Sequence, residues 1–89
     1  MEKEILFFYG TECPHCLIVE KHVDKLIEEG YVIRKVEVWH NKENDKWLET
    51  LDIGENSCGG VPFFLNQITG QTICGEATYQ DIKNWATKK

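Results

Sequence analysis

Residues 5–16 read Ile5-Leu6-Phe7-Phe8-Tyr9-Gly10-Thr11-Glu12-Cys13-Pro14-His15-Cys16, an apolar run, a short polar turn and two cysteines separated by two residues. The run within residues 4–9 is apolar on both alternating faces, which is typical of a central strand covered on both sides. A helical pattern begins at Cys13, and Pro14 suits its first turn because the missing N–H is not needed there. The order therefore predicts a strand, a tight turn and a helix with Cys13 at the helix N-terminus.

This predicted position determines the chemistry of Cys13. Unpaired backbone N–H groups and the positive end of the helix dipole both lie at a helix N-terminus. They favour a thiolate, which is the reactive form of cysteine. Cys16 follows about one helical turn later, close enough to form a disulfide with Cys13. We therefore predict that Cys13 attacks a disulfide and that Cys16 resolves the mixed disulfide.

Periodicity and turn signals predict three helices and three further strands in the rest of the chain. In chain order they are a helix over 13–29, a strand over 31–38, a helix over 41–53, a strand over 61–65, a strand over 71–74 and a helix over 79–87. The helix between the first two strands predicts that they are parallel, with a right-handed crossover. The predicted order is β-α-β-α-β-β-α in a single domain, residues 1–89.

This order, the C-P-x-C sequence after the first strand and the Val61-Pro62 pair that opens the third strand together resemble the thioredoxin fold in its short, glutaredoxin-like form. The Pro14-His15 pair between the cysteines is similar to that of DsbA-type disulfide oxidants. The resemblance implies a three-layer α/β/α sandwich around a four-stranded mixed sheet. It also implies a thiol–disulfide oxidoreductase that uses Cys13 and Cys16 and needs no bound metal or organic cofactor.

The resemblance further implies where a substrate binds. In this family the Val-Pro bond is cis, and the backbone of the residue at Val61 pairs with an extended substrate beside the cysteines. Pro62 suits the first residue of a strand because it cannot donate to the sheet ladder. Glutaredoxins hold glutathione with the Val-Pro backbone and the start of the last helix, which correspond to Val61, Pro62, Gly75 and Thr78 here.

Two positions depart from the thioredoxin pattern. In thioredoxins a buried Asp in the first strand relays a proton to the resolving cysteine, and Phe7 occupies that position here. A Trp precedes the first cysteine of thioredoxins, whereas Glu12 stands here, where its charge opposes a Cys13 thiolate. Both departures weigh against a true thioredoxin.

His15 lies between the two cysteines and allows two interpretations. It could be an exposed residue near a helix start without a chemical role. We favour an electrostatic role, in which a cationic ring or a ring N–H near Cys13 stabilises the thiolate and therefore the reduced protein. A stabilised reduced form makes the disulfide a stronger oxidant. His22 and His40 have no partner at a regular spacing, and we expect them on the surface.

The four cysteines leave several alternatives open. Cys13 and Cys16 could be a redox pair, half of a metal site or two inert thiols, but a zinc site usually needs two close-spaced pairs and only one is present. The alternatives to a redox enzyme are a metal- or Fe–S-binding protein using Cys13 and other cysteines, and a non-catalytic redox sensor. Cys58 and Cys74 fall at the same predicted sheet end as Cys13. They could form a second disulfide, which would be a possible second redox pair, act as regulatory thiols or serve as small apolar residues. Geometry decides such bonds and the sequence does not.

Length and composition narrow the function classes. The 89 residues, 42% hydrophobic and 28% charged, suit one globular domain. A net charge of −5 argues against a nucleic-acid partner, and no apolar run is long enough for a membrane span. We expect no signal peptide and a cytoplasmic location, where a C-x-x-C is more often catalytic or metal-binding than structural. The expected protein is a monomer that exchanges with protein or glutathione disulfides and takes electrons from glutathione or a reductase.

Overall fold

The computed structural model describes residues 3–52 and 57–87. Its elements follow the predicted order β-α-β-α-β-β-α, which is confirmed. In chain order they are β1 (Ile5–Tyr9), α1 (Pro14–Glu28), β2 (Arg34–Glu37), α2 (Lys42–Leu51), β3 (Phe63–Asn66), β4 (Thr72–Cys74) and α3 (Tyr79–Trp85).

The four strands form one mixed sheet in the order β2-β1-β3-β4. Strand β1 pairs with β2 in parallel and with β3 antiparallel, and β3 pairs antiparallel with β4. The central position of β1 explains why its sequence is apolar on both faces: Phe8 is flanked by Val36 on one side and by Phe63 on the other. The four-stranded mixed sheet of the predicted fold is therefore present.

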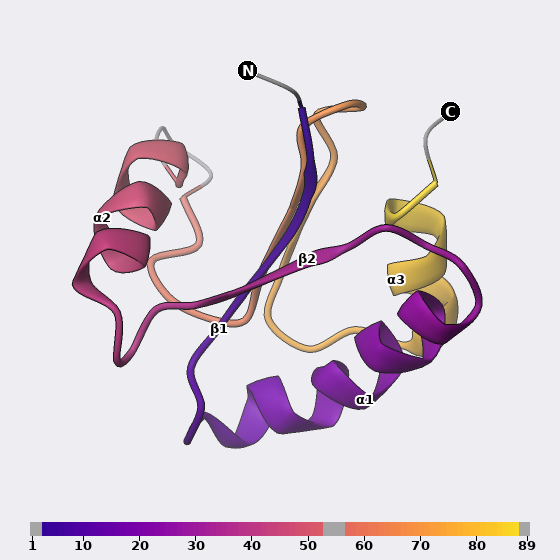
Figure 1. Cartoon of the computed structure of the whole chain (residues 1–89), viewed down its shortest axis with the longest axis horizontal. Coiled ribbons are helices and arrows are strands. Elements are labelled where there is room, and N and C mark those ends of the chain that lie inside the picture. The colour runs from indigo at the N-terminus through magenta and orange to yellow at the C-terminus, as the bar shows by residue number, and fades with distance from the viewer. Residues whose placement is uncertain (1–2, 53–56, 88–89) are drawn as a thin grey trace.

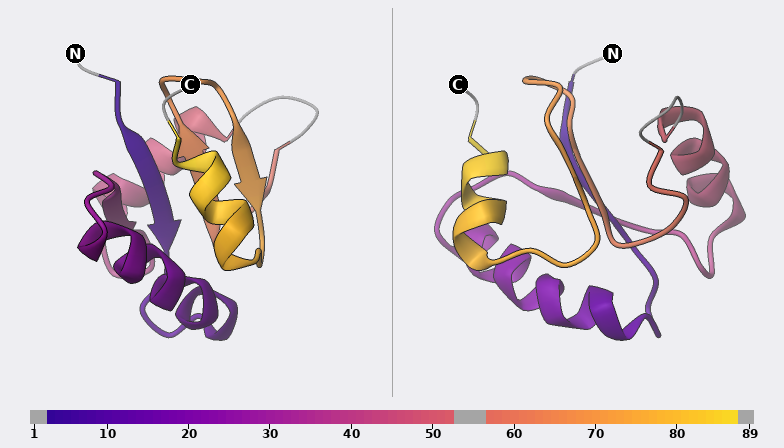
Figure 2. Two further views of the ribbon diagram at one scale, coloured as in Figure 1. Left: turned by 90° about the vertical axis from the view of Figure 1, so that its right-hand side faces the viewer. Right: turned by 180° about the vertical axis from the view of Figure 1, so that it is seen from behind.

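Helices cover both faces of the sheet and complete the α/β/α sandwich (Figures 1 and 2). Helices α1 and α3 lie on one face, where Phe7 and Phe64 pack with Val19, Val23, Ile82 and Trp85. Helix α2 lies on the other face, where Phe8 and Phe63 pack with Leu48. Neighbouring residues such as Phe7 and Phe8 enter different cores because side chains alternate across a strand.

The element bounds differ from the predictions mainly at the strand starts. Strand β2 pairs only over Arg34–Glu37, not over 31–38, and β3 begins at Phe63, two residues later than predicted. Helix α2 begins after Asn41, whose side-chain oxygen accepts the N–H of Asn44 at 3.0 Å. Its predicted last residue, 53, lies outside the described residues. Among the described residues, no helix is both long enough and apolar enough to cross a membrane.

Candidate active site

Cys13 is the N-cap residue of α1, as the sequence predicts. Its Sγ accepts the backbone N–H of Cys16 at 3.2 Å, and its own N–H donates to the carbonyl of Gly10 at 3.0 Å. Pro14 occupies the first helical turn, where its missing N–H leaves no bond unmade. The Cys13 side chain therefore satisfies one of the free N–H groups at the start of α1.

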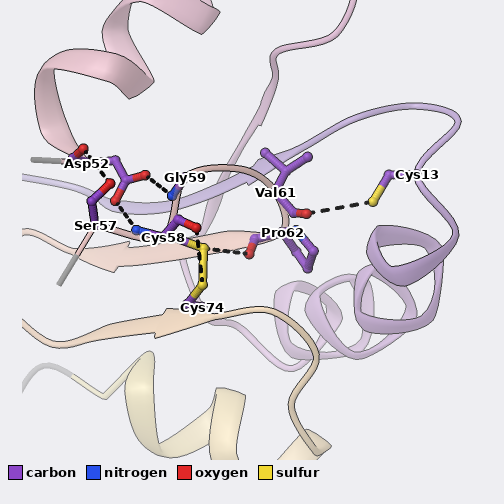
Figure 3. The surroundings of a disulfide bond; sticks show 8 residues. All are labelled: Cys13, Asp52, Ser57, Cys58, Gly59, Val61, Pro62 and Cys74. Carbon is purple, nitrogen blue, oxygen red and sulfur yellow. Dashed lines mark hydrogen bonds between the residues drawn. A yellow bond between two sulfur atoms is a disulfide. The ribbon is translucent and has the colours of Figure 1, made fainter.

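The two thiols are more deeply placed than a helix start suggests. Cys13 is 4% exposed and Cys16 is 0% exposed, so Cys13 is the more accessible of the two by a narrow margin. The sulfur of Cys13 lies 4.0 Å from the carbonyl oxygen of Val61, which comes from the segment before β3 (Figure 3). The Cys13 sulfur and the Val61 carbonyl therefore lie side by side.

Cys16 has a strongly perturbed acidity. Burial and a hydrogen bond with Cys13 raise the pKa of the Cys16 thiol to about 12, and the carboxylate of Glu20 acts in the same direction. Phe7, which stands where thioredoxins carry a buried Asp, is itself fully buried. Cys16 is therefore a protonated thiol at neutral pH, and Phe7 offers it no carboxylate as a proton acceptor.

The Val61-Pro62 peptide bond is cis, and it lies beside Cys13 as predicted. Pro62 is buried and Val61 is half-buried. The carbonyl of Pro62 accepts the N–H of Gly75 at 2.9 Å, which ties this segment to the loop after β4. We call Val61 and Pro62 the substrate edge, because the family resemblance implies that a substrate backbone pairs here. The carbonyl of Val61 lies beside Cys13.

Glu37, at the end of β2, holds the turn that precedes Cys13. Its carboxylate accepts the backbone N–H and the hydroxyl of Thr11, each at 3.0 Å. It also accepts the N–H groups of Trp39 at 3.2 Å and His40 at 2.7 Å. Burial disfavours the charged carboxylate, but these donors outweigh it and keep the pKa of Glu37 below its usual range. Sequence reasoning missed Glu37 because a strand-end Glu carries no motif.

Two further side chains of the β2–α2 loop contact the same turn. The ring of Trp39 packs on Gly10, and Nε2 of His40 lies 2.6 Å from a carboxylate oxygen of Glu12. This contact raises the pKa of His40. His40 is exposed, as predicted, but it has a partner 28 residues away that no local spacing reveals. A protonated His40 offsets the Glu12 charge that opposes a Cys13 thiolate.

His15 also has a partner that the sequence did not indicate. Its Nδ1 lies 2.7 Å from a carboxylate oxygen of Glu76, in the loop between β4 and α3, and both side chains are exposed. The pair brings that loop to the start of α1. The third histidine, His22, lies edge-on to the ring of Tyr79, away from the motif.

The other predicted site residues lie at the same end of the sheet. Cys58 and Cys74 form a disulfide with a Cα–Cα distance of 5.5 Å, which realises one of the alternatives that the sequence left open. Gly75 has a positive φ of 86° and directs its N–H to Pro62, as described above. The hydroxyl of Thr78 accepts the N–H of Asp81 at 3.1 Å and so caps α3.

Residues 3–52 and 57–87 contain no group of three or more His, Cys, Asp and Glu side chains that could hold a metal ion. Cys58 and Cys74 are bonded to each other, whereas Cys13 and Cys16 are free thiols. The sequence matches no known protein-family model. A search of curated proteins likewise finds no significant match.

Proposed function

We propose that this chain is a thiol–disulfide oxidoreductase of the thioredoxin-fold class, in the glutaredoxin-like form. The observation that carries the proposal is the placement of Cys13: its sulfur caps a helix, accepts the N–H of Cys16 and faces the carbonyl of Val61. This combination provides a stabilised nucleophile, a resolving thiol and a backbone group for a substrate. The proposed partners are disulfides of proteins or glutathione and an electron donor, glutathione or a reductase, in the cytoplasm.

The proposed reaction transfers two electrons in two exchange steps. The Cys13 thiolate attacks one sulfur of the substrate disulfide, forms a mixed disulfide and expels the other substrate sulfur as a thiolate. Cys16 then loses its proton and attacks Cys13 Sγ, which forms the Cys13–Cys16 disulfide and releases the second substrate sulfur as a thiolate that takes up a proton. The reverse sequence oxidises a dithiol.

The acidity of Cys16 supports this order of events. Burial is the largest cause of the raised pKa of Cys16, and a free Cys13 raises it further through a hydrogen bond and through its charge. Once Cys13 is tied in a mixed disulfide it carries no charge, so its electrostatic contribution disappears and the pKa of Cys16 falls. Cys16 therefore becomes a better nucleophile at the moment when its attack is needed.

Two variants test the proposal on a purified chain in which Cys13 and Cys16 are free thiols and the Cys58–Cys74 bond is intact, as alkylation confirms. Each is incubated with a fluorescent peptide disulfide. Cys13→Ser should abolish exchange, because the nucleophile is missing. Cys16→Ser should accumulate a mixed disulfide at Cys13, because the resolving thiol is missing, and mass spectrometry identifies the bonded residue. The proposal fails if the wild-type chain does not exchange, or if Cys13→Ser exchanges as fast as wild type.

A further inference from the structure

The Cys58–Cys74 disulfide and the Cys13 thiol lie on opposite sides of the substrate edge (Figure 3). Cys58 Sγ is 3.9 Å from the carbonyl oxygen of Pro62, and Cys13 Sγ is 4.0 Å from that of Val61. Consecutive residues of one short segment therefore contact both sulfur centres. Breaking the Cys58–Cys74 bond would therefore act on Cys13 through the Val61-Pro62 dipeptide alone.

The Cys58–Cys74 disulfide is one of few contacts that hold residues 58–60, the segment just before Val61. The backbone N–H groups of Cys58 and Gly59 donate to the carboxylate of Asp52 at 2.6 and 2.8 Å, at the end of α2. Between Cys58 and Val61 stand only Gly59 and Gly60, both exposed, and a Cβ placed on either would meet nothing within 4 Å. Glycine is the residue with the most backbone freedom, so these two positions resist movement of the segment least.

The disulfide is also accessible to a reductant. Cys74 ends β4, a strand of three residues at the edge of the sheet, and is exposed, whereas Cys58 is half-buried. An attacking thiolate therefore reaches Cys74 Sγ first, with Cys58 as the leaving group. Access to the disulfide sulfur is one of the factors that set the rate of thiol–disulfide exchange.

We propose that Cys58–Cys74 is a second thiol–disulfide exchange site, and that its reduction by a dithiol frees the substrate edge and weakens docking of extended disulfide substrates at Cys13. The inference rests on the proposed function of Cys13. One thiolate of the dithiol attacks Cys74 Sγ and releases Cys58 as a thiolate, which takes up a proton. The second thiol of the reductant then loses its proton and attacks the reductant's own sulfur in the mixed disulfide. This closes the reductant's disulfide and releases Cys74 as a thiolate, which takes up a proton. Two electrons pass from the dithiol to the Cys58–Cys74 pair.

The first experiment uses the wild-type chain and asks whether the bond is reducible in the folded protein. Increasing dithiothreitol is followed by alkylation, peptide mapping of each cysteine and circular dichroism at every step. We expect Cys58 and Cys74 to become alkylated together while the helical signal is retained. Labelling of Cys58 and Cys74 only after the helical signal is lost would overturn the inference, because the bond would then be purely structural.

The second experiment compares wild type with Cys58→Ser/Cys74→Ser on two substrates. For a peptide disulfide, whose extended backbone needs the substrate edge, we expect kcat/KM to fall at least fivefold. For the small aromatic disulfide 5,5′-dithiobis(2-nitrobenzoic acid), which has no peptide backbone, we expect a change of less than twofold. Cys58→Ala/Cys74→Ala is the matched control and should behave as the serine variant does, because both lack the bond.

The outcomes separate the two proposals. If wild type exchanges neither substrate, the proposed function itself fails. If wild type and both double variants exchange the peptide equally well, the function stands and the coupling to the Cys58–Cys74 pair is wrong. If the double variants do not fold, the dithiothreitol series on wild type still decides whether Cys58–Cys74 is an exchange site.

Discussion

The indole of Trp39 lies flat enough against Gly10 that a Cβ placed on Gly10 would stand 2.2 Å from Cδ2 of the ring. Gly10 is the first residue of the turn before α1, and its carbonyl accepts the N–H of Cys13. The Trp39 ring therefore packs against the backbone that positions Cys13. Trp39 is nevertheless 51% exposed, and its outer face is open to solvent. Gly10 is therefore required here for space and not for an unusual backbone angle.

Gly10→Ala should destabilise the protein by about 1–3 kcal/mol, because the methyl group overlaps the ring and one of them must move. Urea unfolding measures this change. Trp39→Ala alone removes exposed ring surface as well as the contact with Gly10, so its effect does not isolate that contact. The double variant does. Gly10→Ala/Trp39→Ala should lose less stability than the two single changes added together. Strict additivity would show that the two residues do not compete for the same space.

Glu37→Gln tests whether the carboxylate positions Cys13 through the turn. An amide keeps one acceptor oxygen but turns an NH₂ group toward N–H donors, so Thr11 or His40 loses its partner. We expect alkylation of Cys13 by iodoacetamide to slow about threefold to tenfold. The turn loses one hydrogen bond to a charged group, and a loss of about 1.4 kcal/mol in positioning Cys13 corresponds to a factor of ten. Asp24→Asn, which alters an exposed carboxylate bonded to Lys35, is the control. Equal alkylation rates in the two variants would contradict the positioning role.

Cys16 should make the reduced protein less stable at alkaline pH. Burial and the contact with Cys13 raise the pKa of this thiol from an ordinary value of 9.0 to about 12. Above pH 9 the unfolded chain loses this proton while the folded chain retains it, so the free energy of unfolding falls as the pH rises from 9 toward 12. Unfolding of the reduced protein between pH 8 and about 11 measures the slope. Cys16→Ser should show a shallower decline, and an unchanged slope would mean that Cys16 ionises as freely in the folded protein as in the unfolded chain.

His15→Tyr should make the Cys13–Cys16 disulfide a weaker oxidant. The sequence predicts that the ring of His15 stabilises a Cys13 thiolate, and a tyrosine in its place could neither carry positive charge nor pair with Glu76 in the same way. Equilibration with a glutathione redox buffer, followed by alkylation, measures the reduction potential. The matched control is His22→Tyr, because His22 lies on the same helix against Tyr79. If His15→Tyr and His22→Tyr give the same potential as wild type, His15 is only a surface residue.

Asn66 should be a major contributor to stability. It is the fully buried polar residue at the end of β3; its amide NH₂ donates to the carbonyl of Trp85 at 2.8 Å, and its oxygen accepts the N–H of Ile68 at 2.9 Å. Asn66→Ala leaves these groups without partners and should cost about 2–3 kcal/mol of unfolding free energy. Asn66→Asp keeps the shape of the side chain, but an ionised carboxylate has no hydrogen to donate to the carbonyl of Trp85. Its loss of unfolding free energy should shrink as the pH falls, because a protonated carboxyl can donate to that carbonyl. A thermal melt at neutral and acidic pH checks both.

Local sequence patterns were sufficient for the order of the elements and for the position of Cys13 at the start of α1. Alternation and helical spacing depend on neighbours within a few residues, so residues 5–9 and the pattern starting at Cys13 could be interpreted without knowing the fold. The cap at Cys13 followed from the turn, the proline and the apolar spacing that surround it. The strand starts were less predictable, because pairing at Arg34 and Phe63 depends on how far the partner strand extends.

Only the tertiary structure decided what surrounds Cys13. The turn before Cys13 is contacted by Glu37 at the end of β2 and by Trp39 and His40 in the loop after it, all distant in sequence. The Cys58–Cys74 bond joins residues 16 apart across the edge of the sheet. Such contacts depend on strand register and on the packing of a helix against each face, which no spacing along the chain encodes. The sequence therefore predicted which thiols form the candidate reactive pair. The tertiary structure decided how deeply they are buried, which backbone they face and which second sulfur pair lies beside them.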